Sequence, residues 1–368
     1  MLIKKIKLLN FRNYEKIDLD FSSGINIIYG KNGQGKTNLI ESIFYLSKTK
    51  SHRISDSHHL IKNNSSSFNI KGIINNDNND TKYQVSLNND EKVFKIDNTI
   101  IKKNSEYISN IDIIIFYPED LEIIKGSPSI RRNYINDELS QLYINYYNVL
   151  SDYNKLLKMK NDYLKNNNYD INYLNILNNY FIDKAVMITK MRKKFIDKIN
   201  EYCTDIYKKI MNLDDFSIKY IPSINFESFD VEKMKIKFSE ELKNHFSEEL
   251  KLKTSVVGPH RDDIEFYLKD LDLKKYGSQG QQRIAVLTMK LCEIEILKKY
   301  KNSVPILLLD DIFSELDDKK KNNLLKLIKN DIQVIITTTD LNKINKKILD
   351  DSKLIEIEKG KIKKIKEV

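Results

Sequence analysis

Apolar and polar residues alternate with period two near the start of the chain. Residues 6–8 and 17–21 follow this alternation, and a denser apolar run covers residues 24–29. Period two is typical of half-buried strands, and a short continuous apolar run is typical of a buried strand. Further short apolar runs lie at residues 68–74, 82–87, 92–96 and 112–117. Because Asn- and Asp-rich turns separate the first three of these runs, we expect an antiparallel β meander there.

The pattern becomes helical in the middle of the chain. Apolar residues recur at alternating spacings of three and four from Leu139 to Leu156, and again from Leu174 to Ile206, with a polar break at residues 166–168. These two stripes predict helices that pair as an antiparallel hairpin. A first helix of about 25 residues, at about 1.5 Å per residue, would make an arm roughly 40 Å long.

The last third of the chain returns to strands and a helix in alternation. Apolar runs at residues 304–309, 333–337 and 353–358 predict strands, and residues 319–329 carry a helical pattern between the first two. Strands that alternate with helices are typical of an α/β fold. We therefore predict that an α/β core closes the chain.

The composition suggests a class of partner and excludes some sites. The 368 residues include 62 Lys and Arg against 52 Asp and Glu, which leaves a formal charge of +10. This charge fits a polyanionic partner such as nucleic acid. The alternative is a compositional bias, because Lys, Asn and Ile are frequent throughout. Two cysteines, Cys203 and Cys292, provide neither a disulfide framework nor a metal cluster.

No segment of the sequence predicts export or membrane insertion. The first eleven residues alternate like a strand and lack the continuous apolar region of a signal peptide. The longest apolar runs, at residues 113–117 and 304–309, are far shorter than the about 20 residues that a membrane-spanning helix requires. We therefore expect a cytoplasmic protein.

Residues 30–37 have the spacing of a phosphate-binding loop. Their sequence, Gly-Lys-Asn-Gly-Gln-Gly-Lys-Thr, fits the pattern G-x-x-x-x-G-K-[ST] between a predicted buried strand and a predicted helix. The glycines let successive backbone N–H groups point at phosphate oxygens, Lys36 reaches the β- and γ-phosphates, and the Thr37 hydroxyl binds Mg²⁺. The residues predicted to bind ATP are Gly30, Lys31, Asn32, Gly33, Gln34, Gly35, Lys36 and Thr37.

A pair of carboxylates follows the apolar run at residues 304–309. Asp310 is predicted to hold Mg²⁺ together with Thr37, and Asp311 is predicted to polarise the attacking water. Lys36 and Asp311 are therefore the predicted catalytic residues. Taken alone, an acidic pair after a strand is also common as a helix N-cap, which is the alternative interpretation.

A polar segment, Ser278-Gln279-Gly280-Gln281, precedes a predicted amphipathic helix at residues 284–298. It resembles the signature motif of ABC-type ATPases, in which a Ser hydroxyl, a Gly N–H and a helix N-terminus cap a γ-phosphate. The resemblance implies that Ser278, Gly280 and Gln281 act across a dimer. ATP would then lie between the phosphate loop of one copy and the signature of the other.

Two later segments resemble further motifs of the same ATPases. Residues 314–317, with Asp317, resemble the D-loop, and residues 336–340, with Thr339, resemble the switch segment. Thr339 stands where many ABC-type ATPases have His, and Asp311 stands where Glu is more usual. These departures predict slow hydrolysis, suited to a timing switch.

Several sequence blocks narrow the resemblance to one family. They are residues 10–14, 30–41, 116–121 and 125–128, Arg131 and Arg132, and residues 258–263 and 278–283. Together they resemble the RecF family of bacterial recombination mediators, within the wider group of SMC and Rad50-like ATPases. The implied fold class is α/β: an ABC-type P-loop ATPase head, with a mixed sheet, flanking helices and an antiparallel β meander, and a short antiparallel helical arm. The implied domains are 1–125 and 256–368, two parts of the ATPase core, and 126–255, the arm.

The resemblance also implies a function in DNA replication and repair, including the SOS response. The family implies an ATP-dependent dimer that binds double-stranded DNA and junctions of double- and single-stranded DNA, and that works with RecR and RecO to load RecA. We therefore expect a cytoplasmic, nucleoid-associated protein that uses ATP and Mg²⁺ and has weak, DNA-stimulated ATPase activity. Arg131 and Arg132 are the candidate DNA contacts, with solvated surface charge as the alternative.

One rival class and two departures stay open at this point. An ATPase subunit of an ABC transporter shares the phosphate loop and the acidic strand, but it does not explain the arm, and residues 117–121 contain no Gln to match the transporter Q-loop. His52 and Asn136 stand where the family usually has Phe and Asp. Residues 258–263 are interpreted as a polar loop between arm and core, with nucleotide or dimer sensing as the alternative.

Overall fold

The computed structural model describes residues 1–77, 79–88, 90–108, 110–165, 170–211, 215–314, 316–328 and 332–367. Contacts divide the chain into two compact units. The first comprises Met1–Asp120, Lys208–Asn212 and Leu287–Val368, and the second comprises Leu121–Tyr207 and Leu213–Val286. Residues 256–286 thus have their contacts in the second unit, whereas the sequence analysis assigns them to the ATPase core. The domain boundaries at 125 and 255 stay a prediction.

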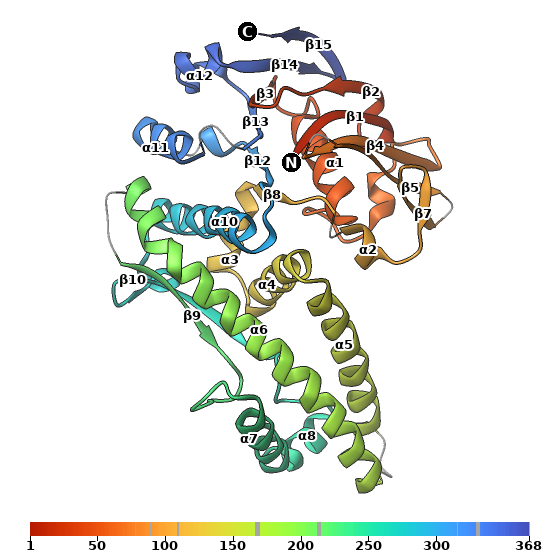
Figure 1. The fold of residues 1–368 in the computed structure, drawn as a ribbon, viewed down its shortest axis with the longest axis vertical. Coiled ribbons are helices and arrows are strands. Elements are labelled where there is room, and N and C mark those ends of the chain that lie inside the picture. Colours follow the sequence, from red (N-terminus) through yellow and green to blue (C-terminus); the bar gives the residue numbers. More distant parts are fainter. Residues whose placement is uncertain are drawn as a thin grey trace. The chain divides into compact units, whose positions relative to one another are not determined.

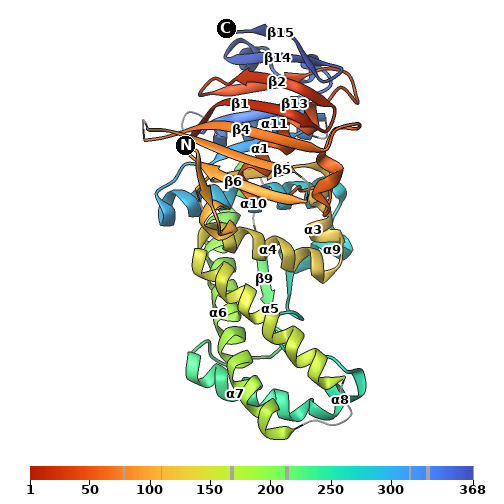
Figure 2. The same cartoon turned by 90° about the vertical axis from the view of Figure 1, so that its right-hand side faces the viewer.

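An antiparallel sheet of the first unit contains the predicted β meander. Its strand order is β2 (Tyr14–Asp20), β1 (Leu2–Phe11), β4 (Ser67–Asn76), β5 (Asn79–Asn88), β6 (Glu91–Ile96) and β7 (Thr99–Ile101). Figure 2 shows β2, β1, β4, β5 and β6 side by side. Ile6 and Leu8 of β1 are buried and Lys7 between them is exposed, because successive side chains of a strand point to opposite faces.

The second sheet of the first unit is mixed. Its strand order is β15 (Lys361–Lys366), β14 (Ser352–Glu358), β3 (Ile25–Tyr29), β13 (Val334–Thr338), β12 (Ile306–Asp310) and β8 (Ile113–Phe116). Neighbours from β14 to β8 run parallel, and the edge strand β15 pairs antiparallel with β14. All residues of β12 and β13 are buried, as expected of parallel strands covered on both faces. The predicted α/β fold class is confirmed.

Helix α1 (Lys36–Lys48) contacts strands of both sheets. Its residues Ile40 and Ile43 share one hydrophobic core with Ile6 of β1 and Ile335 of β13. The shorter helices of this unit are α2 (Asn104–Ile108), α11 (Asp318–Ile328), α12 (Lys346–Asp350), η1 (Ser57–Leu60), η3 (Ile312–Ser314) and η4 (Leu341–Lys343). The helix predicted at residues 319–329 corresponds to α11. Residue 329, the last of the predicted range, lies outside the described residues.

Two helices of the second unit pair as the predicted antiparallel hairpin. They are α5 (Ile144–Leu164) and α6 (Ile171–Met211), of which residues 208–211 belong to the first unit. Tyr163 lies against Tyr173, and Tyr153 lies against Phe181, so the two helices run in opposite directions (Figure 1). The predicted polar break at 166–168 lies outside the described residues.

The predicted first helix of the arm, of about 25 residues, is wrong in its extent. It is divided at Tyr143, whose backbone is extended (φ −136°), into α4 (Pro128–Leu142) and the 21-residue α5. The spacing does not reveal this break, because the buried stripe continues across it from Leu139 to Tyr146. The partner helix α6 has 41 residues. At about 1.5 Å per residue it is about 60 Å long, which exceeds the predicted length.

The second unit also contains elements that the periodicity does not predict. They are the antiparallel strands β9 (Phe216–Ile221), β10 (Asp263–Leu268) and β11 (Leu271–Asp272), and the helices α3 (Glu122–Lys125), α7 (Val231–Asn244), α8 (Phe246–Leu252) and α9 (Leu273–Tyr276). Two further elements have residues in both units, η2 (Pro118–Leu121) and α10 (Gln279–Lys301). Helix α10 contains the helix that the sequence analysis predicts at residues 284–298. The strands β9, β10 and β11 are at most six residues long. In β9 buried residues alternate with more exposed ones, a pattern of period two that the sequence analysis misses.

Hydrogen bonds fix the loop at residues 258–263 within the second unit. Arg192 of α6 donates to Asp262 Oδ2 at 3.1 Å and to the Pro259 carbonyl at 2.6 Å, and both charged side chains are at most 3% exposed. Asn136, one of the departures from the family, accepts a hydrogen bond from the same guanidinium at 2.9 Å. These contacts favour the interpretation of the segment as a structural polar loop.

A buried ion pair lies beside the helical hairpin. Lys160 Nζ of α5 is 2.8 Å from Glu249 Oε2 of α8, and the two side chains are at most 1% exposed. Glu249 also accepts a hydrogen bond from Ser255 Oγ at 2.7 Å, and Lys160 Nζ lies 5.1 Å from the centre of the Phe181 ring. Burial lowers the pKa of Lys160, and the Glu249 carboxylate opposes this shift. Each charge therefore depends on the other.

We predict that Lys160→Met destabilises the protein by about 3–5 kcal/mol, because it leaves the Glu249 carboxylate buried without its cation. Lys165→Met is a control of the same chemistry, since the Lys165–Asp162 pair is 3.0 Å long but more than half exposed, and it should cost less than about 1 kcal/mol. Urea unfolding measures both free energies. Equal losses in the two variants would contradict the account of the buried pair.

His52 belongs to an aromatic cluster of the first unit. Its ring centroid lies 4.6 Å from that of Tyr117 and 5.3 Å from that of Phe44. Neither ring nitrogen has a hydrogen-bond partner among the described residues. Burial lowers the pKa of His52 to about 4, although the nearby Glu41 carboxylate opposes this. The imidazole is therefore neutral at pH 7 and packs as the family's usual Phe would.

We predict that His52→Phe removes part of the acid sensitivity of folding. Between about pH 6.5 and pH 4 the unfolded chain binds a proton at His52 that the folded chain refuses, so stability is lost as the pH falls through this range. Urea unfolding at about pH 7.5 and about pH 5 should show a smaller loss for the variant than for wild type. His260, which has a similar shift, cancels in this difference. The same loss in both proteins would refute the assignment.

Candidate functional site

Three parallel strands place the predicted motifs at one edge of the mixed sheet. β3, β13 and β12 are neighbours and run in the same direction, so their carboxyl ends lie together (Figure 1). The phosphate loop follows β3, Asp310 and Asp311 lie at the end of β12, and Thr339 follows β13. Ligands of α/β sheets bind at this edge. Segments from both ends of the chain thus form one site.

The phosphate loop has the backbone that its glycines predict. Gly30, Gly33 and Gly35 have φ angles of 152°, 76° and 118°, which residues with a side chain rarely adopt. At Gly35 an added Cβ would also lie 2.7 Å from Asn13 Nδ2. Lys36 begins α1, and its Nζ donates hydrogen bonds to two carbonyls of the loop, at 2.8 and 2.9 Å.

Asp310 lies within hydrogen-bond distance of the loop. The Thr37 hydroxyl donates to Asp310 Oδ1 at 3.1 Å. Burial raises the pKa of Asp310, and hydrogen bonds from Thr337 and Thr37 oppose this shift. A hydroxyl and a carboxylate oxygen are the hard ligands that Mg²⁺ prefers, and Mg²⁺ commonly needs only one or two protein ligands beside phosphate and water. The predicted pair of ligands therefore fits a magnesium ion.

Five of the eight residues predicted to bind ATP line a cavity of about 220 Å³, whereas Gly30, Lys31 and Gln34 are not part of its lining. Its lining consists of Asn32, Gly33, Gly35, Lys36, Thr37, Asn38, Arg53, Asp311, Thr337 and Thr339. Burial lowers the pKa of Lys36, and the carboxylates of Asp311 and Asp310 oppose this shift. The predicted catalytic residue Asp311 and the predicted switch residue Thr339 thus face the same space as the phosphate loop.

The turn between β1 and β2 is hydrogen-bonded to the phosphate loop, a role that the sequence analysis misses. Asn13 Nδ2 donates to the Gln34 carbonyl at 3.0 Å, and Tyr14 OH donates to the Gly35 carbonyl at 2.9 Å. Both residues belong to one of the sequence blocks that carry the family resemblance. Their role could not be predicted, because no spacing rule connects them to a loop about twenty residues later.

Arg53 lines the cavity, which the sequence analysis does not predict. Its Nη1 donates to Asn38 Oδ1 at 3.2 Å. Its backbone N–H donates to Ser51 Oγ at 2.9 Å, and Ser51 in turn donates to the buried Glu41, which binds Arg12 through both carboxylate oxygens. Burial would raise the pKa of Glu41, but hydrogen bonds from Arg12 and Ser51 hold it below its ordinary value. Arg53 adds positive charge to a cavity suited to phosphate.

The predicted signature residues form the N-terminus of α10 and belong to the second unit. Gln281 N donates to Ser278 Oγ at 3.3 Å, and Ser278 N donates to Gln281 Oε1 at 2.9 Å. This reciprocal pair is a capping box. Ser278 and Gly280 are exposed. An added Cβ at Gly280 would meet no atom within 4 Å, so the packing of the chain itself does not require glycine there.

The remaining predicted site residues, Asp317, Arg131 and Arg132, have hydrogen-bond partners outside the phosphate-loop cavity. Asp317 accepts the backbone N–H of Lys320 at 2.9 Å, and the hydrogen bond from the Lys320 side chain lowers its pKa. Residue 315 of the predicted D-loop lies outside the described residues.

Arg131 is buried and donates to both carboxylate oxygens of Asp263, at 2.6 and 2.9 Å. Arg132 donates to a backbone carbonyl at 2.9 Å. Arg131 therefore has a structural partner, and DNA contact by either arginine stays a prediction.

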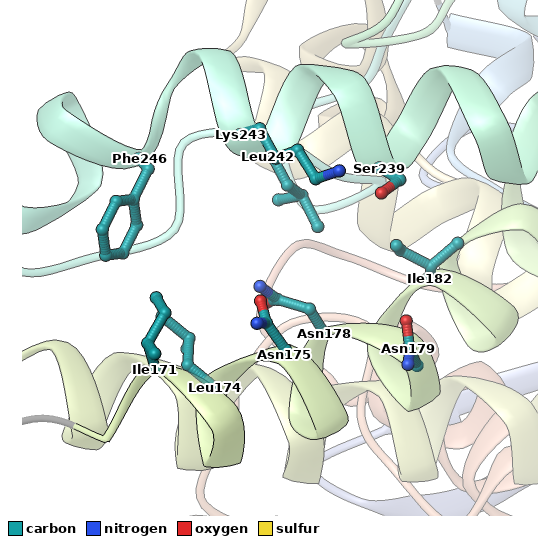
Figure 3. Close-up of a pocket in the computed structure, with 10 residues that line it drawn as sticks. All are labelled: Ile171, Leu174, Asn175, Asn178, Asn179, Ile182, Ser239, Leu242, Lys243 and Phe246. Atoms are coloured by element: carbon teal, nitrogen blue, oxygen red, sulfur yellow. The ribbon is translucent and has the colours of Figure 1, made fainter.

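A larger cavity, of about 360 Å³, lies in the second unit between α6 and the helices α7 and α8. Figure 3 shows the residues that line it: Ile171, Leu174, Asn175, Asn178, Asn179, Ile182, Ser239, Leu242, Lys243 and Phe246. It contains neither a glycine loop nor a carboxylate.

Within the described part of the chain no cluster of His, Cys, Asp and Glu suits a metal, and no described helix is long and apolar enough to cross a bilayer. The phosphate-loop cavity is the candidate site, because it brings glycines of a phosphate loop together with Lys36, Thr37 and Asp311.

Known proteins resemble this chain over nearly its whole length. The family described as RecF/RecN/SMC N terminal domain matches residues 2–364. The chain is 37% identical to the DNA replication and repair protein RecF of Staphylococcus haemolyticus, covering 98% of this chain and 100% of that protein. It is 36% identical to the RecF protein of Listeria monocytogenes, covering 99% and 100% of the two chains.

Solved structures agree with these relatives. A structure of the recombination mediator protein RecF with ATP, in the RecFOR pathway, matches with a TM-score of 0.90 and 33% identity, covering 100% of this chain and 97% of that one. An SMC head bound to the C-winged helix domain of ScpA shares the fold alone, with a TM-score of 0.56 and 17% identity over 100% and 98% of the two chains. The chain belongs to the RecF family of DNA replication and repair proteins.

Proposed function

We propose that this protein binds ATP and Mg²⁺ in the phosphate-loop cavity and uses them to control DNA binding during recombinational repair and replication-fork maintenance. The observation that carries the proposal is the meeting of Lys36, Thr37, Asp310 and Asp311 at one edge of the mixed sheet. A relative at 33% identity that is described with ATP supports it. Membership of the RecF family decides against a transporter ATPase subunit.

The nucleotide chemistry follows from the groups in the cavity. Thr37 and Asp310 would hold Mg²⁺, which when bound neutralises charge on the phosphates. Lys36 and the loop N–H groups bind the phosphate oxygens, and Asp311 orients the attacking water. An aspartate reaches less far than the glutamate more usual in such ATPases, and Thr339 offers no ring nitrogen. We therefore infer slow, DNA-stimulated hydrolysis that resets the protein and does not drive mechanical work.

The signature acts in trans in this proposal. Ser278, Gly280 and Gln281 of one copy cap the γ-phosphate held by the phosphate loop of another. The exposed Ser278 hydroxyl supports this, and so does a glycine at 280 that leaves open space at a helix N-terminus, since a backbone without Cβ admits a close phosphate. ATP would thereby join two copies into a homodimer.

The DNA partner is double-stranded DNA, in particular junctions with single-stranded DNA at gaps. The dimer would hold DNA there and act with RecR and RecO to load RecA, in the cytoplasm and at the nucleoid. The charge of +10 and the family relatives support this part of the proposal. The DNA contacts are mainly to phosphate, and Arg132 is the better of the two candidates, because Arg131 is already paired with Asp263.

Sedimentation of the purified protein with and without Mg-ATP tests the ATP-dependent dimer. We expect wild type to move from monomer to dimer when ATP is added. Lys36→Met removes the phosphate contact and Ser278→Arg places a bulky side chain where the second copy must approach, so both variants should stay monomeric. Circular dichroism shows whether each variant is folded. A mass that ignores ATP in wild type would contradict the proposal.

The proposed phosphate contacts predict steep salt dependence and little sequence preference. A protein that neutralises about six phosphates loses about 10³-fold in affinity between about 50 and about 200 mM salt. Fluorescence anisotropy with gapped duplexes of two unrelated sequences measures both properties. Arg132→Ala should lower the salt slope by about one if this side chain contacts phosphate. Binding that is sequence-selective and insensitive to salt would refute the proposed contacts.

A further inference from the structure

Thr337 stands between the two carboxylate residues of the site. It lies on β13 and is completely buried. Its hydroxyl donates a hydrogen bond to Asp310 Oδ1 at 2.5 Å and accepts one from the backbone N–H of Asp311 at 3.0 Å. A single hydroxyl therefore contacts both the predicted metal ligand and the backbone of the residue predicted to orient water. Thr337 lies within the predicted switch segment, residues 336–340, but the resemblance assigns a role there to Thr339 and none to Thr337.

The second of these bonds acts on an unusual backbone conformation. Asp311 has a φ angle of 52°, which is unfavourable for a residue with a side chain. Such conformations persist only where surrounding contacts determine them, and they concentrate at functional sites. The hydrogen bond from Asp311 N–H to Thr337 is one such contact. It fixes the direction in which the Asp311 side chain leaves the backbone and enters the cavity.

The first bond matters because Asp310 is a predicted ligand of Mg²⁺. Thr37 also donates to Asp310 Oδ1, at 3.1 Å, and its oxygen is the second predicted ligand, since a hydroxyl can donate its hydrogen and bind a cation through a lone pair at the same time. Thr337 is not a predicted metal ligand, so its hydroxyl can act on the metal only through Asp310. A hydroxyl that donates to a ligating carboxylate holds that carboxylate in one position.

We propose that Thr337 is a positioning residue of the nucleotide site, which sets Asp310 for Mg²⁺ and Asp311 for water through one hydroxyl. The inference rests on the proposed function of this site. It predicts that loss of the hydroxyl weakens the response to Mg²⁺ more than it weakens the binding of the nucleotide itself, because Lys36 and the loop N–H groups are untouched.

A Mg²⁺ titration with a fluorescent ATP analogue tests this inference by binding alone. Thr337→Val keeps the shape and removes the hydroxyl, and Thr337→Ser keeps the hydroxyl. We expect the Mg²⁺ concentration at half-saturation to rise about 10-fold or more in Thr337→Val and to stay within about 2-fold of wild type in Thr337→Ser. Nucleotide affinity without Mg²⁺ should be alike in all three. Lys160→Met, which is destabilised in the second unit, should keep the wild-type Mg²⁺ requirement.

Each outcome decides the proposal. An unchanged Mg²⁺ requirement in Thr337→Val, or an equal shift in Thr337→Ser or in Lys160→Met, would overturn it and leave Thr337 a structural residue. If Thr337→Val does not fold, Thr337→Cys takes its place, because a thiol has similar volume and is a much weaker hydrogen-bond donor. If wild type binds no nucleotide, the proposed function fails as well. If wild type binds Mg²⁺ and nucleotide normally, an unchanged variant refutes this inference alone.

Discussion

The amide groups of a phosphate loop can bind an anion only while the backbone keeps a conformation that most residues reject. In this protein, positive φ angles at Gly30, Gly33 and Gly35 provide that conformation. The loop cannot maintain this conformation alone, because an N–H group that faces the anion cannot also form a helix or sheet hydrogen bond. Asn13 and Tyr14 therefore bind loop carbonyls from a neighbouring strand turn, and the first unit can be understood as support for this short segment.

The acidic residues of the site also depend on other segments of the chain for their positions. Parallel pairing of β3, β13 and β12 sets the loop, Thr337 and Asp310 at adjacent strand ends. Thr337 and Thr37 then hold Asp310 by hydrogen bonds in a position where burial raises its pKa. Hydrogen bonds from these two hydroxyls thus oppose the rise in the pKa of the predicted metal ligand.

Local pattern was sufficient to predict most strands of the first unit, the helical hairpin of the arm and the phosphate-loop motif, because each depends on a short stretch of sequence with its own period or spacing. Contacts between distant segments could not be predicted. The bond from Asn13 to the loop, the bond from Arg53 to Asn38, and the pairing of Arg131 with Asp263 each join positions that no spacing connects. The break at Tyr143 stayed hidden because the buried stripe passes through it unchanged.

The central claim is that ATP joins two copies through the phosphate loop of one and the signature of the other. Mixing Lys36→Met protein with Ser278→Arg protein, each with a distinct tag, tests this most directly. In a mixed dimer one composite site has an intact Lys36 and an intact Ser278, whereas neither variant alone can form such a site. The account predicts that Mg-ATP yields mixed dimers in sedimentation and in co-purification by either tag. A mixture that remains monomeric, with each variant folded, would contradict it.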